Sequence, residues 1–293
     1  MTAPVASRAL SPILAQLRGE PSRTWSLIIT MFGDAIAPRG GVVWLGTLLT
    51  FFRALDIGDG VVRTAMSRLA ADGWLERSRV GRNSFYRLAD KGRDAFREAS
   101  ARIYAPRPPV WAGYFDLALL SASADREAAR AALEAAGFGA AAPGVWIAPG
   151  GAAPREVEGV LRLQAHGDAR THRALAARGW PLEATGAAYM RFLVAFGPLR
   201  AALEADAAFT DLEAFAARIL MIHNYRRIVL RDPGLPAELL PADWPGAAAR
   251  RLCAAVYARV ATASERWLDE TAKGEDGAPL PADRHGIARR FVD

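Results

Sequence analysis

The apolar positions between Gly58 and Leu88 follow a helical period first and a strand period afterwards. A single stripe at helical spacing is formed by Val62, Ala65, Met66 and Leu69. Gly73 follows, at the position where a helix often ends in the left-handed conformation that glycine adopts without strain. Residues 74–78 and 84–88 then have the composition of two short strands joined by a polar turn. The pattern predicts a short amphipathic helix followed directly by a β-hairpin.

The polar positions of the same stretch carry donors that suit nucleic acid. Arginine and hydroxyl side chains occupy the helix face opposite the apolar stripe, and arginines and an asparagine occupy the hairpin. Such groups donate to phosphates and base edges, and a basic helix followed by a basic hairpin is typical of a winged helix-turn-helix. The candidate DNA-binding residues are Arg63, Thr64, Ser67, Arg68, Arg77, Arg79, Arg82 and Asn83. The alternative is a solvated charged face on an ordinary three-helix module.

Residues 23–105 are predicted to form this DNA-binding domain, after a flexible arm at residues 1–22. Gly58 or Asp59 is expected to cap the basic helix. Further helices of the domain are expected at 26–35, 44–55 and 90–104.

Residues 106–170 are predicted to form a ferredoxin-like α/β middle domain, introduced by a proline-rich linker at 105–109. Its expected elements are a strand at 111–120, a helix at 125–136 and strands at 138–142, 145–148 and 160–165. This order fits a ferredoxin-like fold if a helical turn precedes the last strand, where the sequence marks a helix only poorly.

Residues 171–275 are predicted to form an all-α C-terminal domain that binds an effector and forms the dimer, followed by a loose tail at residues 276–293. Its expected helices lie at 182–204, 211–230 and 247–271. The expected fold class is therefore α+β and multidomain, with a winged helix-turn-helix, a ferredoxin-like domain and an all-α domain in that order.

The positive charge of the chain is concentrated in the predicted DNA-binding domain. The whole chain has 37 Lys and Arg against 31 Asp and Glu, and residues 1–107 hold 16 against nine of these. Residues 108–293 therefore hold 21 against 22 and are nearly neutral. A basic domain joined to a neutral remainder is typical of a nucleic-acid binder that carries a sensing or assembly module. An arginine-rich surface that reflects codon usage is the plainer alternative.

Composition excludes several other classes of protein. With 52% hydrophobic and 23% charged residues, the chain has the composition of a globular protein, and no apolar run approaches the length of a membrane span. The N-terminus lacks the pattern of a secretory signal. Cys253 is the only cysteine, which excludes an intramolecular disulfide and a cysteine-rich zinc site. A cytoplasmic protein without a resident cofactor or metal is expected.

Four segments of the chain closely resemble the PaaX-like family of transcriptional regulators, which includes the phenylacetic acid degradation repressor. These segments are SLIITMFGD, RTAMSRLAADGWLERSRVGRNSFYRL, GVWIAP and IHNYRRIVLRDPGLPAELLPADWPG. The resemblance extends from about Trp25 to Trp267. One departure concerns the start of the basic helix, where the family usually has Ser or Thr and this chain has Gly58-Asp59-Gly60.

The resemblance implies a bacterial winged-helix repressor of an aromatic or acyl-coenzyme A catabolic operon. It also implies a middle domain similar to the ferredoxin-like CRISPR-associated integration nucleases. Such a regulator binds double-stranded operator DNA and is released by an aryl-acetyl-coenzyme A ester such as phenylacetyl-coenzyme A. A homodimer is expected, because two copies would match a palindromic operator.

The effector site is predicted in the segment His223-Asn224-Tyr225-Arg226-Arg227, with Arg231 one helical turn beyond Arg227. Two arginines spaced by one turn suit the phosphates of coenzyme A, because each guanidinium offers a planar fork of donors. Trp146, Trp180 and Trp244 are candidates for the wall of an aromatic acyl pocket. The proposed effector-binding residues are Trp146, His223, Tyr225, Arg226, Arg227 and Arg231. The alternative is that the His and Arg side chains tie helices together and that the tryptophans are core residues.

An enzyme is the contrasting hypothesis. Asp116 lies in the first strand of the middle domain, where the similar nucleases keep a metal-binding carboxylate, so a metal-dependent nuclease is the alternative function. Two-metal hydrolysis needs several convergent carboxylates, and the sequence indicates only this one. His166 and His172 lack partners for a triad or zinc site, and no phosphate-binding glycine motif is present. The sequence therefore favours a regulator and no catalytic residue is predicted.

Overall fold

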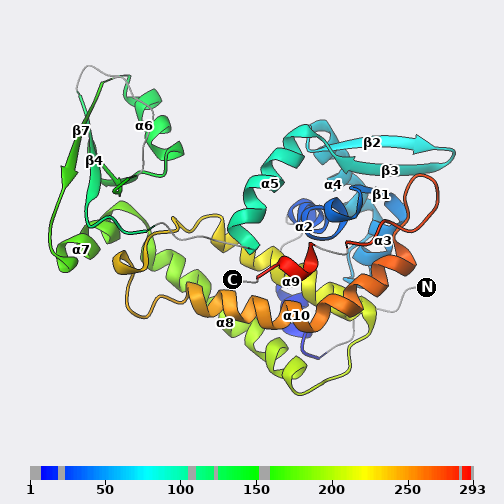
Figure 1. Cartoon of the computed structure of the whole chain (residues 1–293). Coiled ribbons are helices and arrows are strands. Elements are labelled where there is room, and N and C mark those ends of the chain that lie inside the picture. Colours follow the sequence, from blue (N-terminus) through cyan, green and yellow to red (C-terminus); the bar gives the residue numbers. More distant parts are fainter. Residues whose placement is uncertain are drawn as a thin grey trace. The chain divides into compact units, whose positions relative to one another are not determined.

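A computed structural model describes residues 8–18, 24–104, 110–121, 125–151, 159–283 and 286–291 (Figure 1). The fold is a mixture of helices and two antiparallel sheets. Contacts divide the chain into unit 1, comprising residues 1–106, 191–227 and 247–293, and unit 2, comprising residues 107–190 and 228–246. This division differs from the three consecutive domains expected from the sequence, because the helices predicted for the C-terminal domain belong largely to unit 1.

The first helices of unit 1 surround a core of large apolar side chains. Helix α2 (Thr24–Met31) continues into a π-helical turn, η2 (Phe32–Ile36), and a 3-10 turn, η3 (Ala37–Arg39). Strand β1 (Val42–Trp44), helix α3 (Leu45–Ala54) and helix α4 (Asp59–Ala71) follow. Among the fully buried residues of these elements are Leu27, Ile28, Phe32, Leu48, Phe52 and Met66. The helices expected at 26–35 and 44–55 are thus present, the first with an irregular end.

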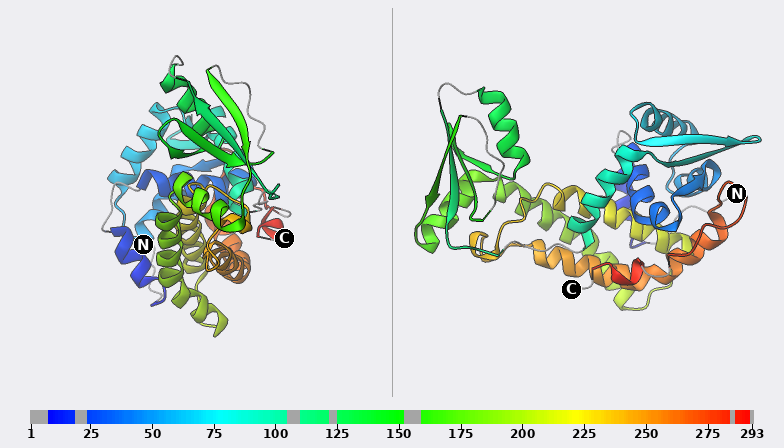
Figure 2. Two further views of the ribbon diagram at one scale, coloured as in Figure 1. Left: turned by 90° about the vertical axis from the view of Figure 1, so that its left-hand side faces the viewer. Right: turned by 45° about the horizontal axis from the view of Figure 1, so that its top comes forward.

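A three-stranded antiparallel sheet with the order β1-β3-β2 completes this part of unit 1. Strands β2 (Leu75–Val80) and β3 (Asn83–Leu88) form the predicted hairpin, and helix α5 (Asp90–Tyr104) has the predicted bounds. The hairpin extends beyond the helices of unit 1 (Figure 2). Strand β1 is not predicted from the sequence, because three residues that pair only with β3 are too few to show a period.

Three helices from the C-terminal half complete unit 1. They are the later part of α8 (Leu182–Glu204), α9 (Asp211–Val229) and α10 (Gly246–Thr271). Helix α9 is buried almost continuously from Ala214 to His223. Rings from three helices meet here, because Phe215 of α9 lies 4.8 Å from Phe51 of α3 and 4.4 Å from Trp267 of α10, measured between centroids. None of the described helices combines the length and the apolar character that a membrane span needs.

The described parts of the expected arm and tail contain regular structure and buried residues. Helix α1 (Ser11–Arg18) lies within the expected arm, and Leu10, Ile13 and Leu14 are buried there. In the expected tail, Lys273 pairs with Pro279 in a β-bridge, and Leu280 and Phe291 are buried beside a 3-10 turn, η5 (Ile287–Arg289). A few buried apolar side chains hold these segments against the rest of unit 1. The polar composition of the two segments does not predict this burial. Residues 1–7 and 19–22 of the arm and the linker at 105–109 lie outside the described residues.

Unit 2 is built on a four-stranded antiparallel sheet with the order β5-β6-β4-β7. Its elements are β4 (Phe115–Leu120), α6 (Arg126–Ala135), β5 (Gly139–Ala142), β6 (Val145–Pro149), β7 (Val160–Ala165), α7 (Ala169–Gly179) and η4 (Ala237–Leu239). One core joins Leu133 of α6 to Ala118 and Trp146 of the sheet, and a second joins Ala176 of α7 to Phe115. The helical turn expected before the last strand would fall in residues 152–158, outside the described residues.

Candidate nucleic-acid interface

Helix α4 has one apolar and one polar face. Val62, Met66 and Leu69 are 0%, 0% and 2% exposed and face the core of unit 1, as their spacing predicts, while Ala65 is half-buried. The opposite face exposes Arg63, Thr64, Ser67 and Arg68. These four positions share a face because the helix repeats every 3.6 residues. The helix therefore presents four donors to solvent while its apolar stripe holds it in place.

An ion pair with the preceding helix fixes the start of α4. Gly58 occupies the cap position with extended backbone and has no side chain to bond the free N–H groups. Asp59 is the first helical residue, and its Oδ1 accepts a hydrogen bond of 2.6 Å from Nε of Arg53 on α3. This hydrogen bond lowers the pKa of the Asp59 carboxyl, which stays charged where the helix dipole favours an anion. The glycine-flanked start is thus held by a contact between two helices.

Glycine determines the end of α4. Gly73 has φ of 72°, and its N–H donates to the carbonyl of Ala70 at 3.1 Å. The N–H of Trp74 donates to the carbonyl of Leu69 at 2.9 Å. These two bonds form a complete Schellman motif, so the predicted left-handed cap is confirmed. The motif turns the chain directly from the helix into strand β2.

The β2–β3 hairpin carries the second group of candidate donors. Val80 pairs with Asn83, so Gly81 and Arg82 form a two-residue turn, with Gly81 at φ of 58° as a type II′ turn requires. Arg77 donates to the Ser84 hydroxyl at 2.8 Å across the strands. The candidate residues Arg77, Arg79, Arg82 and Asn83 are all exposed. The turn chemistry therefore places basic side chains at and near the tip.

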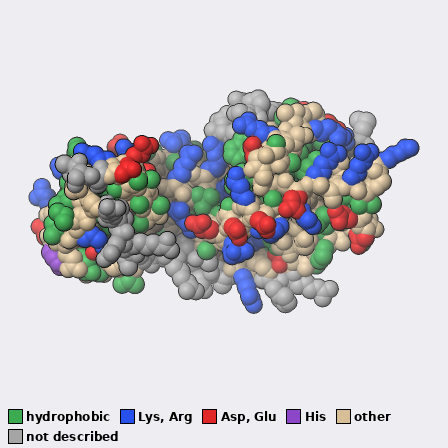
Figure 3. Space-filling model, turned by 90° about the horizontal axis from the view of Figure 1, so that it is seen from above, with side chains coloured by type: hydrophobic (Ala, Val, Ile, Leu, Met, Phe, Trp, Pro, Cys, Tyr) green, Lys and Arg blue, Asp and Glu red, His purple; other side chains and the backbone are tan. Residues whose placement is uncertain are grey.

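The surface formed by α4 and the hairpin is basic. Residues 58–88 hold six arginines against three carboxylates. The ion pairs that engage two of these arginines are exposed, with Arg68 3.7 Å from Asp72 and Arg87 2.7 Å from Glu76. Exposed pairs of this kind contribute little to stability, so these arginines are available to exchange partners. Figure 3 shows basic side chains gathered over the end of unit 1 that carries the hairpin.

The C-terminal segment, residues 272–283 and 286–291 after α10, also contacts the hairpin. The sequence does not predict this contact. Glu275 accepts a hydrogen bond from the Ser78 hydroxyl on β2. The N–H of Trp44 in β1 donates to the carbonyl of Lys273 at 2.9 Å, and Thr47 donates to the carbonyl of Thr271 at the same distance. Residues beyond α10 thus lie along the sheet of the candidate interface. A single polar residue such as Glu275 has no sequence pattern that would reveal this contact.

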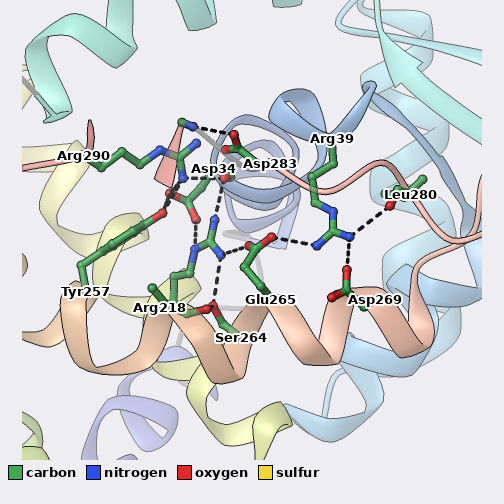
Figure 4. A network of polar contacts seen from close by, with 12 residues as sticks. Asp34, Arg39, Arg218, Tyr257, Ser264, Glu265, Asp269, Leu280, Asp283 and Arg290 are labelled. Atoms are coloured by element: carbon green, nitrogen blue, oxygen red, sulfur yellow. Dashed lines mark hydrogen bonds and ion pairs between the residues drawn. The ribbon is translucent and has the colours of Figure 1, made fainter. Parts of the chain in front are cut away.

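Unit 1 also contains a buried network of charged side chains (Figure 4). Asp34 of η2 accepts a hydrogen bond of 2.6 Å from Nε of Arg218, and both side chains are 1% exposed. Nη1 of Arg290 lies 3.0 Å from Asp34 Oδ1, and the hydroxyls of Tyr104 and Tyr257 donate to the same oxygen. Burial alone would raise the pKa of Asp34, but the two guanidiniums outweigh it and lower that pKa. Asp34 is therefore a buried carboxylate that remains charged.

The network continues along α10. Glu265 accepts 2.6 Å and 2.7 Å hydrogen bonds from Arg218 and from Arg39 of η3, respectively. Asp269 is a second acceptor for Arg39. The network thus joins η2 and η3 to α9, α10 and the C-terminal segment within unit 1. Buried charges at scattered positions show no sequence period, so the sequence did not predict it.

The predicted effector segment on α9 is engaged with helix α2. Nδ1 of His223 lies 3.1 Å from the Thr30 hydroxyl, and Nε of Arg226 donates to that hydroxyl at 2.7 Å. Arg226 also donates to the carbonyl and the hydroxyl of Ser26, at 2.9 Å and 2.7 Å. Burial lowers the pKa of Arg226 to about 10. These contacts match the alternative interpretation, in which the segment ties helices together.

The remaining effector candidates are not brought together by a single helix. Tyr225 is buried among the Phe192 and Phe291 rings, and Arg227 is half-buried. Helix α9 ends at Val229, so Arg231 lies beyond it and does not share a helix face with Arg227 as expected. The N–H of Arg231 already bonds the Ile228 carbonyl in a turn before Pro233. The prediction that Arg227 and Arg231 lie on one face of the same helix is therefore wrong.

The tryptophans proposed for the effector pocket and Asp116, the residue of the alternative nuclease hypothesis, all lie in unit 2, where they contact other side chains of that unit. Trp146 is 6% exposed in the core with Leu133, while Trp180 and Trp244 pack against the second core. Asp116 lies 3.8 Å from Arg162, and His172 packs against aromatic rings. Across the described residues, no three His, Cys, Asp or Glu side chains gather as a metal site would need.

Comparison with known proteins gives matches over most of the chain. Residues 23–92 match the family model described as PaaX-like protein, and residues 180–270 match the model described as PaaX-like protein C-terminal domain. The chain is 40% identical over 285 residues to the transcriptional repressor PaaX of Escherichia coli (strain K12), covering 91% of this chain and 89% of that protein. The chain belongs to the PaaX-like family. A solved structure, the uncharacterized protein Rv0674 from Mycobacterium tuberculosis, is 28% identical with a TM-score of 0.49, covering 74% of this chain and 90% of that one.

The two PaaX-like matches include both the candidate interface and most of the buried network. The first contains all eight candidate DNA-binding residues, together with Asp34 and Arg39. The second contains Arg218 and Glu265. In this PaaX-like chain the regions of the two matches are therefore joined by buried ion pairs within unit 1.

Proposed function

We propose that this PaaX-like protein is a bacterial transcriptional repressor that binds operator DNA through α4 and the β2–β3 hairpin. The observation that carries the proposal is the exposed row of Arg63, Thr64, Ser67 and Arg68 on a helix that is followed directly by a basic hairpin. The order α2, α3, α4, β2, β3 supports a winged helix-turn-helix. The similarity to a transcriptional repressor of Escherichia coli supports repression.

In this proposal the two elements have different roles. Helix α4 lies in the major groove, where Arg63 and Arg68 donate to guanine O6 and N7 or to phosphates, and Thr64 and Ser67 to bases or phosphates. The hairpin lies against the backbone or the minor groove, with Arg77, Arg79, Arg82 and Asn83 as donors. The helix then supplies sequence discrimination and the hairpin supplies general affinity.

Replacing Arg82 by alanine is expected to weaken binding to every duplex alike. Arg82 lies in the hairpin turn and is exposed, so its loss removes a phosphate contact without disturbing the core. We expect the slope of log affinity against log salt to fall by about one unit. Fluorescence anisotropy titrations at several salt concentrations measure that slope.

Arg130→Ala is the matched control, because Arg130 is also an exposed arginine and lies on α6 of unit 2. Its slope should equal that of the unaltered protein. An unchanged slope for Arg82→Ala would remove the hairpin from the interface.

We further propose that unit 2 is a ferredoxin-like domain. The strand order β5-β6-β4-β7 supports this, since the middle strand β4 comes first in the chain and pairs with both β6 and β7. Helix α7 departs from the usual order because it follows the last strand instead of preceding it. A homodimer is part of the same proposal, because two copies would place two hairpins on a palindromic site.

An acyl-coenzyme A ester is proposed as the ligand that releases the repressor. Resemblance to a repressor of phenylacetate catabolism supports this ligand class. His223 and Arg226 bond Thr30 of α2, which packs against α4. A ligand that displaced these bonds would therefore alter the packing of α2 beneath α4. Adding phenylacetyl-coenzyme A to the operator complex is expected to lower operator affinity, whereas free coenzyme A should not. Equal affinity with and without the ester would eliminate this ligand.

A further inference from the structure

A cavity of about 290 Å³ lies within unit 1 between α5, the η2–η3 turn and the C-terminal segment. Leu88, Pro38 and Phe96 supply apolar wall, and Ser100, Tyr104 and Arg290 supply polar groups. The Phe96 ring lies directly against Gly33, where no Cβ would fit. The close approach of Phe96 to the backbone therefore fixes one wall of the cavity.

Arg290 presents an ordered guanidinium to this cavity. Its Nη1 donates to the Asp34 carbonyl at 2.7 Å, to Asp34 Oδ1 at 3.0 Å and to the Tyr257 hydroxyl. Its Cζ lies 4.7 Å from the centroid of the Tyr104 ring, so a cation–π contact also holds the guanidinium group in place. All three bonds use Nη1, and no residue in the described ranges accepts a bond from Nε or Nη2. The edge formed by Nε and Nη2 is the one that binds a carboxylate through two parallel hydrogen bonds.

Arg290 shares its carboxylate with a second guanidinium. The carboxylate is Asp34, and the second guanidinium is that of Arg218. Glu265 pairs with Arg218 and Arg39, and Asp269 also pairs with Arg39, so these pairs within the described residues join three guanidiniums to three carboxylates. Arg93 and Arg97 line the cavity as well, and each has an exposed ion pair on α5, with Asp90 and Asp94 respectively. Exposed pairs of this kind are weak. A ligand carboxylate would bind the Nε and Nη2 edge of Arg290, which the bonds to Asp34 and Tyr257 do not use.

The size of the cavity decides the class of ligand. Small-molecule sites commonly measure roughly 300 to 1,000 Å³, and this one is at the lower limit. It has room for one ring or a short alkyl chain, and most of a coenzyme A ester would lie outside it. A thioester also lacks the carboxylate that the free edge of Arg290 would recognise.

We propose that this cavity is a binding site for a small organic monocarboxylate with an apolar body. The carboxylate pairs with Nε and Nη2 of Arg290, and the apolar body packs against Phe96, Leu88 and Pro38. The lining of the proposed site includes none of the candidate DNA-binding residues and neither His223 nor Arg226. A ligand there would link the C-terminal segment to α5.

Calorimetric titration of the full chain with benzoate, hexanoate and the neutral analogue benzamide tests the site. We expect at least one of the two carboxylates to bind and benzamide not to bind. Arg290→Lys should weaken carboxylate binding about tenfold, because lysine keeps the charge but loses the planar fork. Ser100→Phe should abolish binding by filling the cavity without touching the Asp34 network. Ala101→Phe, at the adjacent exposed position of α5, is the matched control and should bind as the unaltered protein does.

Two results would overturn the site. One is the absence of carboxylate binding to the unaltered protein. The other is equal binding by Ser100→Phe and Ala101→Phe, which would show that the ligand binds elsewhere. Either result leaves the proposed repressor function untouched if the same preparation, without carboxylate, still binds operator DNA. Operator affinity is therefore measured in parallel. Thermal unfolding of each variant verifies that a loss of binding does not reflect a loss of folding.

Discussion

Replacing Asp34 by asparagine is expected to lower the free energy of unfolding by about 3 to 5 kcal/mol. Asp34 and Arg218 are both buried, and Arg290 depends on the same carboxylate. Asparagine keeps the shape of the side chain but leaves two guanidiniums in the interior without their shared charge. Losing one partner of a buried ion pair costs far more than losing an exposed pair, because the remaining charge is not hydrated.

Urea unfolding followed by circular dichroism measures this loss. Asp94→Asn is the control, because Asp94 pairs with Arg97 in an exposed i and i+3 arrangement on α5. The control should unfold with the midpoint of the unaltered protein. If Asp34→Asn also keeps that midpoint, the buried network does not stabilise unit 1.

The same comparison has a definite dependence on pH. The pKa of Asp34 is lowered in the folded protein from its ordinary value of 3.8. A carboxyl with a lowered folded pKa contributes stability that is fully present above its unfolded pKa and is lost as pH falls through the folded pKa. The difference between the unaltered protein and Asp34→Asn should therefore be constant near neutral pH and shrink only below about pH 4.

Replacing Arg63 by alanine is expected to reduce discrimination between operator and random DNA by about 1 to 3 kcal/mol. Arg63 lies on the exposed face of α4, one residue from the buried Val62, so its side chain points away from the core. A bidentate contact to guanine would be lost on operator DNA, while random DNA would lose at most one phosphate contact. The fold should be unaffected, since no core residue changes.

The candidate interface was predictable because its pattern is local. The spacing of Val62, Met66 and Leu69 determines which face of α4 is buried, and the remaining positions follow from the helical period. Gly73 and Gly81 have the positive φ angles that their turns require. These features depend on neighbours within a few residues, so the sequence contains them directly.

Other features depend on partners far apart in the chain and were missed. Asp34 meets Arg218 and Arg290 across 184 and 256 positions, and a single charged residue gives no indication of such a partner. The boundary between the units falls within α8, between Met190 and Arg191, where no proline-rich or glycine-rich linker marks it. Arg231 was misplaced for a simpler reason: the helical period continued past the residue where α9 ends.

The central claim, that α4 reads sequence and the hairpin adds general affinity, is tested most directly by titrating Arg63→Ala and Arg82→Ala side by side. Each variant is titrated against a duplex that the unaltered protein selects from a random library and against a duplex of random sequence, at two salt concentrations. We predict that Arg63→Ala loses affinity mainly for the selected duplex, whereas Arg82→Ala loses it for both and has the shallower salt dependence. Unaltered binding of both variants to both duplexes would contradict the proposed interface, and equal losses on both duplexes for Arg63→Ala would contradict its role in reading bases.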